Sequence, residues 1–251
     1  AYLGDENLNA EFKINASDLI VLPGGIDPHV HVDQPSGDDV IMADDFQSAT
    51  KSAAAGGNTT ILPFAMQIKG QSLRKCVEDY HKKAQGNMYI DTSFHLIISD
   101  PTPQVLGQEL PALSKDGYTS FKVFMTYDDL VLNDKELIEV FDVAKQLKTL
   151  VMVHAEGYDS IKYLSDKFEK EGKTAPYYHA PTRPQIVERE ATHRAISHAQ
   201  IVDIPLMIVH VSGEEALNQI RWAKDKGIKV FSETCPQSVS YTHLRAHETC
   251  H

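Results

Sequence analysis

The chain has 251 residues, of which 42% are hydrophobic and 24% charged, as is usual for a globular protein with a sizeable core. Its formal net charge of -11 argues against nucleic acid or an anionic membrane surface as a partner. Three cysteines without CxxC spacing, no charged-then-apolar leader and no apolar run of membrane-spanning length are typical of a cytoplasmic protein.

After residue 20 the chain alternates between short apolar runs, typical of buried strands, and longer amphipathic runs, typical of helices. Ser72 is placed to cap one helix, and Gly117 and Gly227 are placed to end two others. Such alternation indicates right-handed βαβ units and a parallel sheet. We predict strands at residues 25–32, 58–64, 90–98, 119–125, 150–154, 206–211 and 229–232, and helices at 45–55, 72–84, 104–115, 134–147, 160–171, 185–201 and 214–226.

Seven such strands indicate an α/β fold, a (β/α)₈ TIM-type barrel that is incomplete by about one strand. A doubly wound sheet is the alternative, but it typically carries a glycine-rich phosphate loop after its first strand, where this chain has histidines instead. The first 20 residues do not fit the repeat and are expected to be the remnant of a small β domain, with a strand at residues 18–22. We therefore divide the chain into residues 1–20, an incomplete barrel at 21–237 and a tail at 238–251.

His29 and His31 are separated by one residue near the end of the first predicted strand. On a strand, alternate side chains point to the same face, whereas on a helix these two would point to different faces. Two imidazoles side by side at a strand end form half of a metal site.

His154 and His210 each close another predicted apolar strand. Taken singly, each is explained at least as well by a buried histidine with satisfied hydrogen bonds. Taken with His29 and His31, they lie where the strands of a barrel end, at the rim that carries the active site in barrel enzymes. The four together predict a metal site at this rim.

Lys122 lies inside the apolar run 120–125, where a lysine must be paired, reach water or lose its charge. Alone, it would be interpreted as an ordinary ion pair or a lysine at a strand end. Beside four histidines a second interpretation opens, because a neutral amine reacts with carbon dioxide to form a carbamate. The two carbamate oxygens can bridge two metal ions about 3.5–4 Å apart, and hydroxide between the ions is a nucleophile at neutral pH.

Seven motifs, in this order and spacing, resemble those of dihydropyrimidinases and D-hydantoinases, the cyclic amidohydrolases of the amidohydrolase superfamily. The resemblance covers about residues 17–237. The motifs are PGGIDPHVH at residues 23–31, GGNTT at 56–60, FKVFMTY at 121–127, VHAE at 153–156, HAPTRP at 179–184, HVS at 210–212 and ETCPQ at 233–237.

The resemblance implies hydrolytic opening of a cyclic amide, either a 5,6-dihydropyrimidine or a 5-substituted hydantoin, to an N-carbamoyl amino acid. It also implies that Tyr127 holds the substrate and stabilises the oxyanion, and that the intact protein is a homotetramer. The implied cofactor is a pair of zinc ions, with His29 and His31 binding one ion, His154 and His210 binding the other, and a carboxylated Lys122 bridging the two.

Members of this family also carry an aspartate after the eighth strand, which ligates zinc and moves a proton. Because the resemblance ends at Gln237, we expect a C-terminally truncated fragment that is insoluble or inactive by itself. Residues 241–249 look like a translated sequencing adapter. The pattern HETCH at residues 247–251 matches the H-E-x-x-H signature of zinc proteases, but the second histidine ends the chain, so we do not expect a zinc site there.

Three further histidines receive no metal-binding role. His193 and His198 lie five residues apart on a predicted helix and are expected at its surface. His179 belongs to the family-like motif HAPTRP, which leaves its role open.

Two alternatives to the hydantoinase interpretation stay open at this stage. One is a noncatalytic relative that serves as a scaffold for cytoskeletal partners, although such relatives have lost metal ligands that this chain keeps. The other is an allantoinase or dihydroorotase. Tyr127, five residues after Lys122, favours the dihydropyrimidinase and hydantoinase branch.

Overall fold

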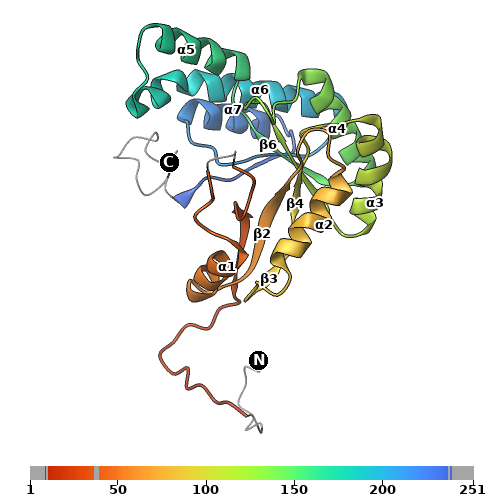
Figure 1. The fold of residues 1–251 in the computed structure, drawn as a ribbon, viewed down its shortest axis with the longest axis vertical. Helices are drawn as coiled ribbons and strands as arrows, with labels where there is room; N and C mark the ends of the chain where they lie inside the picture. The colour runs from red at the N-terminus through yellow and green to blue at the C-terminus, as the bar shows by residue number, and fades with distance from the viewer. Residues whose placement is uncertain (1–8, 10, 37–39, 237, 239–251) are drawn as a thin grey trace.

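The computed structural model describes residues 9, 11–36, 40–236 and 238, and these form a curled, all-parallel sheet with helices along its outer face (Figure 1). Neighbouring strands follow the chain order, apart from the two-residue β3 (Asp91–Thr92), which pairs with β2 only. The sheet is the incomplete barrel that the strand–helix alternation predicts. Its main path runs through β1 (Gly25–Val30), β2 (Asn58–Met66), β4 (His95–Ile97), β5 (Ser120–Phe124), β6 (Leu150–His154), β7 (Leu206–Ile208) and β8 (Val230–Ser232).

Each of the seven predicted helices is present, and side-chain caps begin several of them. The carboxylate of Asp45 accepts from the backbone N–H of Ser48, and Ser72 accepts from Lys75 as expected. The helices are α1 (Phe46–Ala55), α2 (Leu73–Ala84), α3 (Leu110–Lys115), α4 (Asp134–Leu147), α5 (Tyr158–Lys170), α6 (Gln185–Val202) and α7 (Glu214–Asp225), with a π-helix η1 (Val105–Glu109) before α3 and a 3-10 helix η2 (Pro176–Thr182) before α6.

Several predicted strands are shorter than expected: the first ends at Val30 and so leaves out His31, and two others are interrupted or end early. The run 90–98 is divided into β3 and β4, which keep the same register against β2 on both sides of the break. Pro63 lies opposite the break and has no N–H to donate to the ladder. The run 206–211 ends at Ile208 because His210 has a left-handed backbone, with a φ of 38°, which no strand accommodates.

The predicted strand at residues 18–22 is wrong. Residues 11–24 run away from the barrel without helix or strand (Figure 1), and Leu19, Ile20 and Leu22 are exposed. A strand needs a neighbour for its backbone hydrogen bonds, and no described strand lies beside this segment. That residues 1–20 are the remnant of a small β domain stays a prediction, as do the other domain boundaries.

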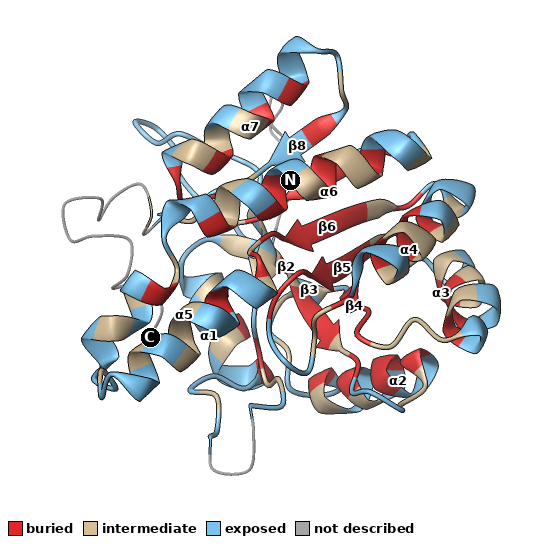
Figure 2. Cartoon of the chain, turned by 90° about the horizontal axis from the view of Figure 1, so that it is seen from above, coloured by how far each residue is buried: buried red, intermediate tan, exposed pale blue. Residues whose placement is uncertain are grey.

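Alternate residues of the strands serve two different layers. Val151 and Val153 belong to the large core between the sheet and the helices, where they are fully buried. Figure 2 shows this layer as buried strands beneath helices with exposed outer faces. The inner face carries a smaller cluster without any helix residue, and this cluster consists of Phe64, Ile97, Phe124, Met152 and Val209. Because Lys122 and His154 are two residues from Phe124 and Met152, they share the inner face.

Phe64 is the centre of the inner face. It is completely buried, and its ring centroid lies 4.6 Å from that of His29, 5.0 Å from that of His31 and 4.9 Å from that of His95. Its ring therefore supports the histidines from below.

Replacement of this ring tests how much of the fold depends on the inner cluster. Phe64→Ala is expected to lower the free energy of unfolding by about 3–5 kcal/mol, because it leaves a cavity on the inner face. The measurement is urea unfolding followed by circular dichroism. Phe168→Ala on α5 is the matched control, since Phe168 is only partly buried and lies outside both clusters. An equal loss in the two variants would contradict a central role for Phe64.

Candidate functional site

The structure brings the four predicted histidines together at the carboxyl ends of the strands. His29 and His31 come from the end of β1 and the residue after it, with ring centroids 5.5 Å apart. The ring of His210 lies 5.7 Å from that of His29 and 4.5 Å from that of His154, which ends β6. Residues far apart in the sequence thus share one site, because parallel strands end at the same edge.

Each of these rings has a close polar neighbour. Nε2 of His210 lies 2.9 Å from Nδ1 of His154, so one of these two nitrogens donates to the other. Nδ1 of His31 contacts Oε1 of Gln34 at 2.7 Å, and Nδ1 of His29 contacts a carboxylate oxygen of Glu233.

The electrostatics of the site favour uncharged imidazoles. The surrounding protein desolvates the ring of His31 and, with repulsion from nearby cationic groups, lowers its pKa to about 4, although the residue as a whole is exposed. Burial likewise lowers the pKa of His154, and it lowers that of His210 well below the ordinary value. These rings are therefore neutral at pH 7, which is the form that binds metal ions.

Lys122 lies on the inner face beneath the histidines and is only 1% exposed. Its Nζ is 5.2 Å from the ring centroids of Phe64 and Phe124. Burial lowers the pKa of this amine to about 7, although Glu233 and Cys235 act in the opposite direction. A large fraction of the amine is therefore uncharged at neutral pH, which is the form that reacts with carbon dioxide.

The donor set fits a metal centre in its chemistry, since it combines neutral imidazoles with a buried amine that can become an anion. In the part of the chain that the structure describes, however, no three His, Cys, Asp or Glu side chains are placed to hold one metal ion together. The histidine rings face one another and their polar neighbours. An unmodified lysine such as Lys122 is not a typical ligand of a metal ion. Binding of zinc ions and carboxylation of Lys122 therefore stay hypotheses at this point.

Tyr127 lies at the mouth of the site, in the turn after β5. Its backbone is left-handed, with a φ of 73°, and its ring is 5.1 Å from the ring of His154. A non-glycine residue in this conformation costs free energy and is concentrated at functional sites. The side chain is 40% exposed and lines a cavity of about 550 Å³ together with Arg183, Met66 and Tyr158. None of the four histidines lines this cavity, and Tyr127 connects it to the ring of His154.

Sequence reasoning missed four polar residues that contact this site or its floor. His95 lies inside a predicted strand without one of the quoted motifs, and its Nε2 lies 2.8 Å from the carbonyl oxygen of Pro28. The others are side-chain partners of the predicted histidines. Glu156 and Glu233 lie in the motifs VHAE and ETCPQ but received no role of their own, and Gln34 lies three residues after His31. These four residues are Gln34, His95, Glu156 and Glu233.

The remaining histidines lie elsewhere or outside the described residues. His193 contacts Gln219 at the helical surface, and the ring of His198 lies 3.3 Å from a carboxylate oxygen of Asp134. His179 accepts a hydrogen bond of 3.2 Å from Nε of Arg183, near the mouth of the site. The HETCH pattern at residues 247–251 lies outside the described residues.

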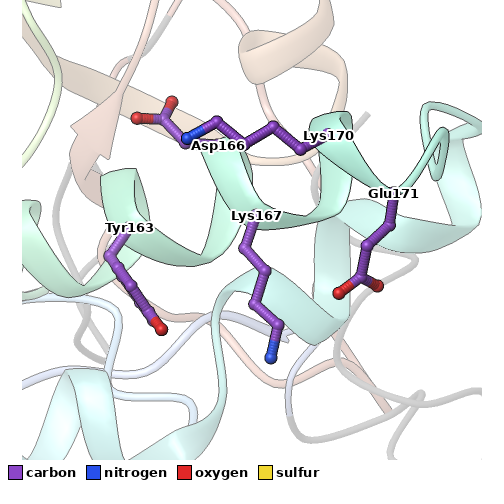
Figure 3. A pocket seen from close by; sticks show the side chains of 5 residues that line it. All are labelled: Tyr163, Asp166, Lys167, Lys170 and Glu171. Carbon is purple, nitrogen blue, oxygen red and sulfur yellow. The ribbon is translucent and has the colours of Figure 1, made fainter.

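A second cavity, of about 400 Å³, lies against α5 (Figure 3). Its lining residues follow the helical spacing of one helix face, and four of the five are charged: Tyr163, Asp166, Lys167, Lys170 and Glu171. None of the predicted site residues contributes to it, so it is a solvated helix surface and not a second candidate site. No described helix combines the length and apolarity that crossing a lipid bilayer requires.

Comparison with known proteins agrees with the expected family. The sequence pattern of the amidohydrolase family matches residues 20–243. The D-hydantoinase of Geobacillus stearothermophilus is 48% identical over 226 residues, which are 89% of this chain and 48% of that protein. The dihydropyrimidinase of Rattus norvegicus is 39% identical over 223 residues, which are 88% of this chain and 42% of that protein.

Solved structures give the same result. A crystal structure of dihydropyrimidinase from Brevibacillus agri matches with a TM-score of 0.84 and 42% identity, covering 91% of this chain and 51% of that one. A structure of D-hydantoinase matches with a TM-score of 0.85 and 45% identity, covering 89% of this chain and 50% of that one. The predicted resemblance is confirmed, and the chain spans about half the length of the relatives it matches.

The burial of Lys122 has a consequence for stability in metal-free, bicarbonate-free buffer. The folded-state pKa of about 7 is lower than the unfolded value of 10.5, so between these values the unfolded chain binds the extra proton and stability rises with pH. From pH 7 to pH 9 the free energy of unfolding is expected to rise by about 2 kcal/mol more in the wild type than in Lys122→Met. Urea unfolding of both proteins at the two pH values measures this. An identical pH dependence would mean that Lys122 is not buried as an amine.

Proposed function

Because the chain belongs to the amidohydrolase family, we propose that the whole protein hydrolyses cyclic amides. The substrates in this proposal are 5,6-dihydropyrimidines or 5-substituted hydantoins, and the products are N-carbamoyl amino acids. The relatives named D-hydantoinase and dihydropyrimidinase support this substrate class. The observation that carries the proposal is Lys122, an amine buried beneath four clustered histidines.

The residues that would hold a pair of zinc ions are the ones already described. His29 and His31 would bind one ion, His154 and His210 the other, and Lys122 would bridge the two as a carbamate. The chemistry that such a pair of ions supplies is polarisation of a carbonyl oxygen and activation of water at neutral pH.

Lys122 supports this arrangement through its own chemistry. The uncharged amine attacks carbon dioxide, an N–C bond forms, and a proton leaves to solvent, so that a neutral group is replaced by an anion with two oxygen atoms. Burial favours the reaction because it lowers the pKa of the amine to about 7. The surrounding histidines are neutral at pH 7, so they do not repel positive metal ions.

Tyr127 would serve the reaction by donating its O–H to the amide oxygen that gains negative charge. Its place at the mouth of the site, with the ring 5.1 Å from that of His154, supports this role. The cavity of about 550 Å³ beside it is open to a substituent on the substrate ring. A homotetramer and a cytoplasmic location stay predictions.

Lys122→Ala in the whole protein is expected to abolish the paired metal centre and nearly all activity. Zinc per chain is measured by elemental analysis and activity by opening of dihydrouracil and of a 5-substituted hydantoin. In the wild type we expect two zinc ions and a mass gain of one carbon dioxide. A variant with two zinc ions and normal turnover would show that the carbamate assignment is wrong. A wild type without zinc would favour the noncatalytic scaffold.

Tyr127→Phe removes one hydroxyl group and keeps the ring that packs near His154. We expect kcat to fall by about 10²–10³-fold with zinc content unchanged, which is the typical effect of losing one donor to a developing oxyanion. Tyr163→Phe on the outer face of α5 is the matched control and should leave kcat unchanged. If kcat of Tyr127→Phe equals that of the wild type, Tyr127 is not the donor.

A further inference from the structure

Arg183 lies beside Tyr127 at the mouth of the site, where the 3-10 helix η2 ends. Its guanidinium carbon is 5.8 Å from the centroid of the Tyr127 ring, which is within the range of a cation–π contact. Arg183 and Tyr127 also line the same cavity of about 550 Å³. A positive charge therefore lies against the ring that carries the proposed oxyanion donor.

The turn before α6 holds the guanidinium group of Arg183 in place. Its Nε donates to Nε2 of His179 at 3.2 Å, and its backbone N–H donates to the carbonyl oxygen of Ala180 at 2.9 Å. Oγ1 of Thr182 donates to the carbonyl oxygen of His179 at 2.6 Å and closes the same turn. Among the described residues, Nη1 of Arg183 is buried and has no hydrogen-bond partner. A partly desolvated cation of this kind interacts more strongly with an aromatic ring than a fully hydrated one does.

The backbone of Tyr127 is held by its turn, and its ring is held by neighbouring side chains. The carbonyl oxygen of Tyr127 accepts from the backbone N–H groups of Leu130 at 3.0 Å and Val131 at 2.8 Å. The ring centroid lies 5.1 Å from that of His154, and Arg183 lies over the ring. Because the side chain is 40% exposed, these contacts have to restrict a ring that is open to solvent.

We propose that Arg183 is a positioning residue for Tyr127, because its guanidinium group holds the Tyr127 ring in the orientation from which the hydroxyl group donates to the substrate. The inference rests on the proposed function, since it concerns the donor of that reaction. A hydrogen-bond donor lowers the barrier of a reaction only when it is already aimed at the atom that gains charge. His179 takes part indirectly, because it fixes the plane of the guanidinium group.

The charge of Arg183 also reaches Glu156, whose carboxylate lies 2.7 Å from Nε2 of His154. Burial acts to raise the pKa of Glu156, but the hydrogen bond with His154 and the charges of His154, Arg183 and His179 outweigh it and lower that pKa. An effect of Arg183 through His154 would change the zinc content of the protein, whereas an effect through Tyr127 would not. Zinc per chain therefore separates the two routes.

The test compares variants of the whole protein with dihydrouracil and unsubstituted hydantoin, because neither substrate carries a ring substituent that would reach the cavity. Arg183→Lys keeps the positive charge, and Arg183→Met keeps the approximate length of the side chain without the charge. Both substitutions are also made in the Tyr127→Phe protein. Arg221→Met, which removes an exposed arginine of α7, is the control for charge. The measurements are kcat, KM, zinc per chain and thermal unfolding.

We expect Arg183→Met to lower kcat by about 3–30-fold, the factor that corresponds to the loss of a partly desolvated cation–π contact. KM and zinc content should stay close to those of the wild type, and Arg183→Lys should retain most of kcat. In the Tyr127→Phe protein, Arg183→Met should change kcat by less than about twofold, because the hydroxyl group that Arg183 positions is absent.

The outcomes separate this inference from the proposal on which it rests. A loss of kcat as large in the Tyr127→Phe protein as in the wild type would overturn the positioning role, because Arg183 would then act independently of Tyr127. Unchanged kcat in Arg183→Met, or loss of zinc or of thermal stability in both Arg183 variants, would also overturn it. All these results leave the proposed function standing. A wild type that opens neither substrate nor any 5-substituted hydantoin would overturn the proposed function and this inference with it.

Discussion

The amine of Lys122, buried on the inner face of a curled parallel sheet, is the constraint on which the rest of the site depends. A lysine with 1% exposure and aromatic rings on two sides has lost most of its hydration, and burial therefore lowers its pKa to about 7. The fold sustains this cost because the outer face of the same strands is packed against helices. The large outer core stabilises the sheet, and the inner face is left available for polar chemistry.

Phe64 belongs both to the hydrophobic cluster of the inner face and to the site. This residue contacts His29, His31 and His95 as well as the amine of Lys122, so the floor of the site is also part of a hydrophobic cluster. The histidines above it are held by oxygen atoms of neighbouring side chains, and burial keeps three of them uncharged. Neutral ring nitrogens are the form of imidazole that binds metal ions.

Much of the fold could be predicted from local patterns. The alternation of apolar and amphipathic runs predicted the parallel strands and their helices, because burial of a strand or a helix face imposes a period on its sequence. The failures have local causes as well: Pro63 interrupts a ladder opposite β3 and β4, and residues 18–22 have strand-like composition without a neighbouring strand. β-Strand propensity is a property of one segment, whereas a strand also needs a neighbouring strand for its backbone hydrogen bonds.

The sequence by itself determined that His29, His31, Lys122, His154 and His210 lie on or next to strands, and the motifs around them indicated the amidohydrolase family. Only the tertiary structure decided how these side chains face one another. The left-handed backbones of Tyr127 and His210, the break opposite Pro63 and the acceptors Gln34 and Glu156 depend on register and on the curl of the sheet. The physical reason is the distance over which each interaction acts. Sequence periodicity reports which face of a helix or strand is buried. The hydrogen-bond partner of a histidine ring must lie within about 3 Å, and only the fold brings such an atom that close.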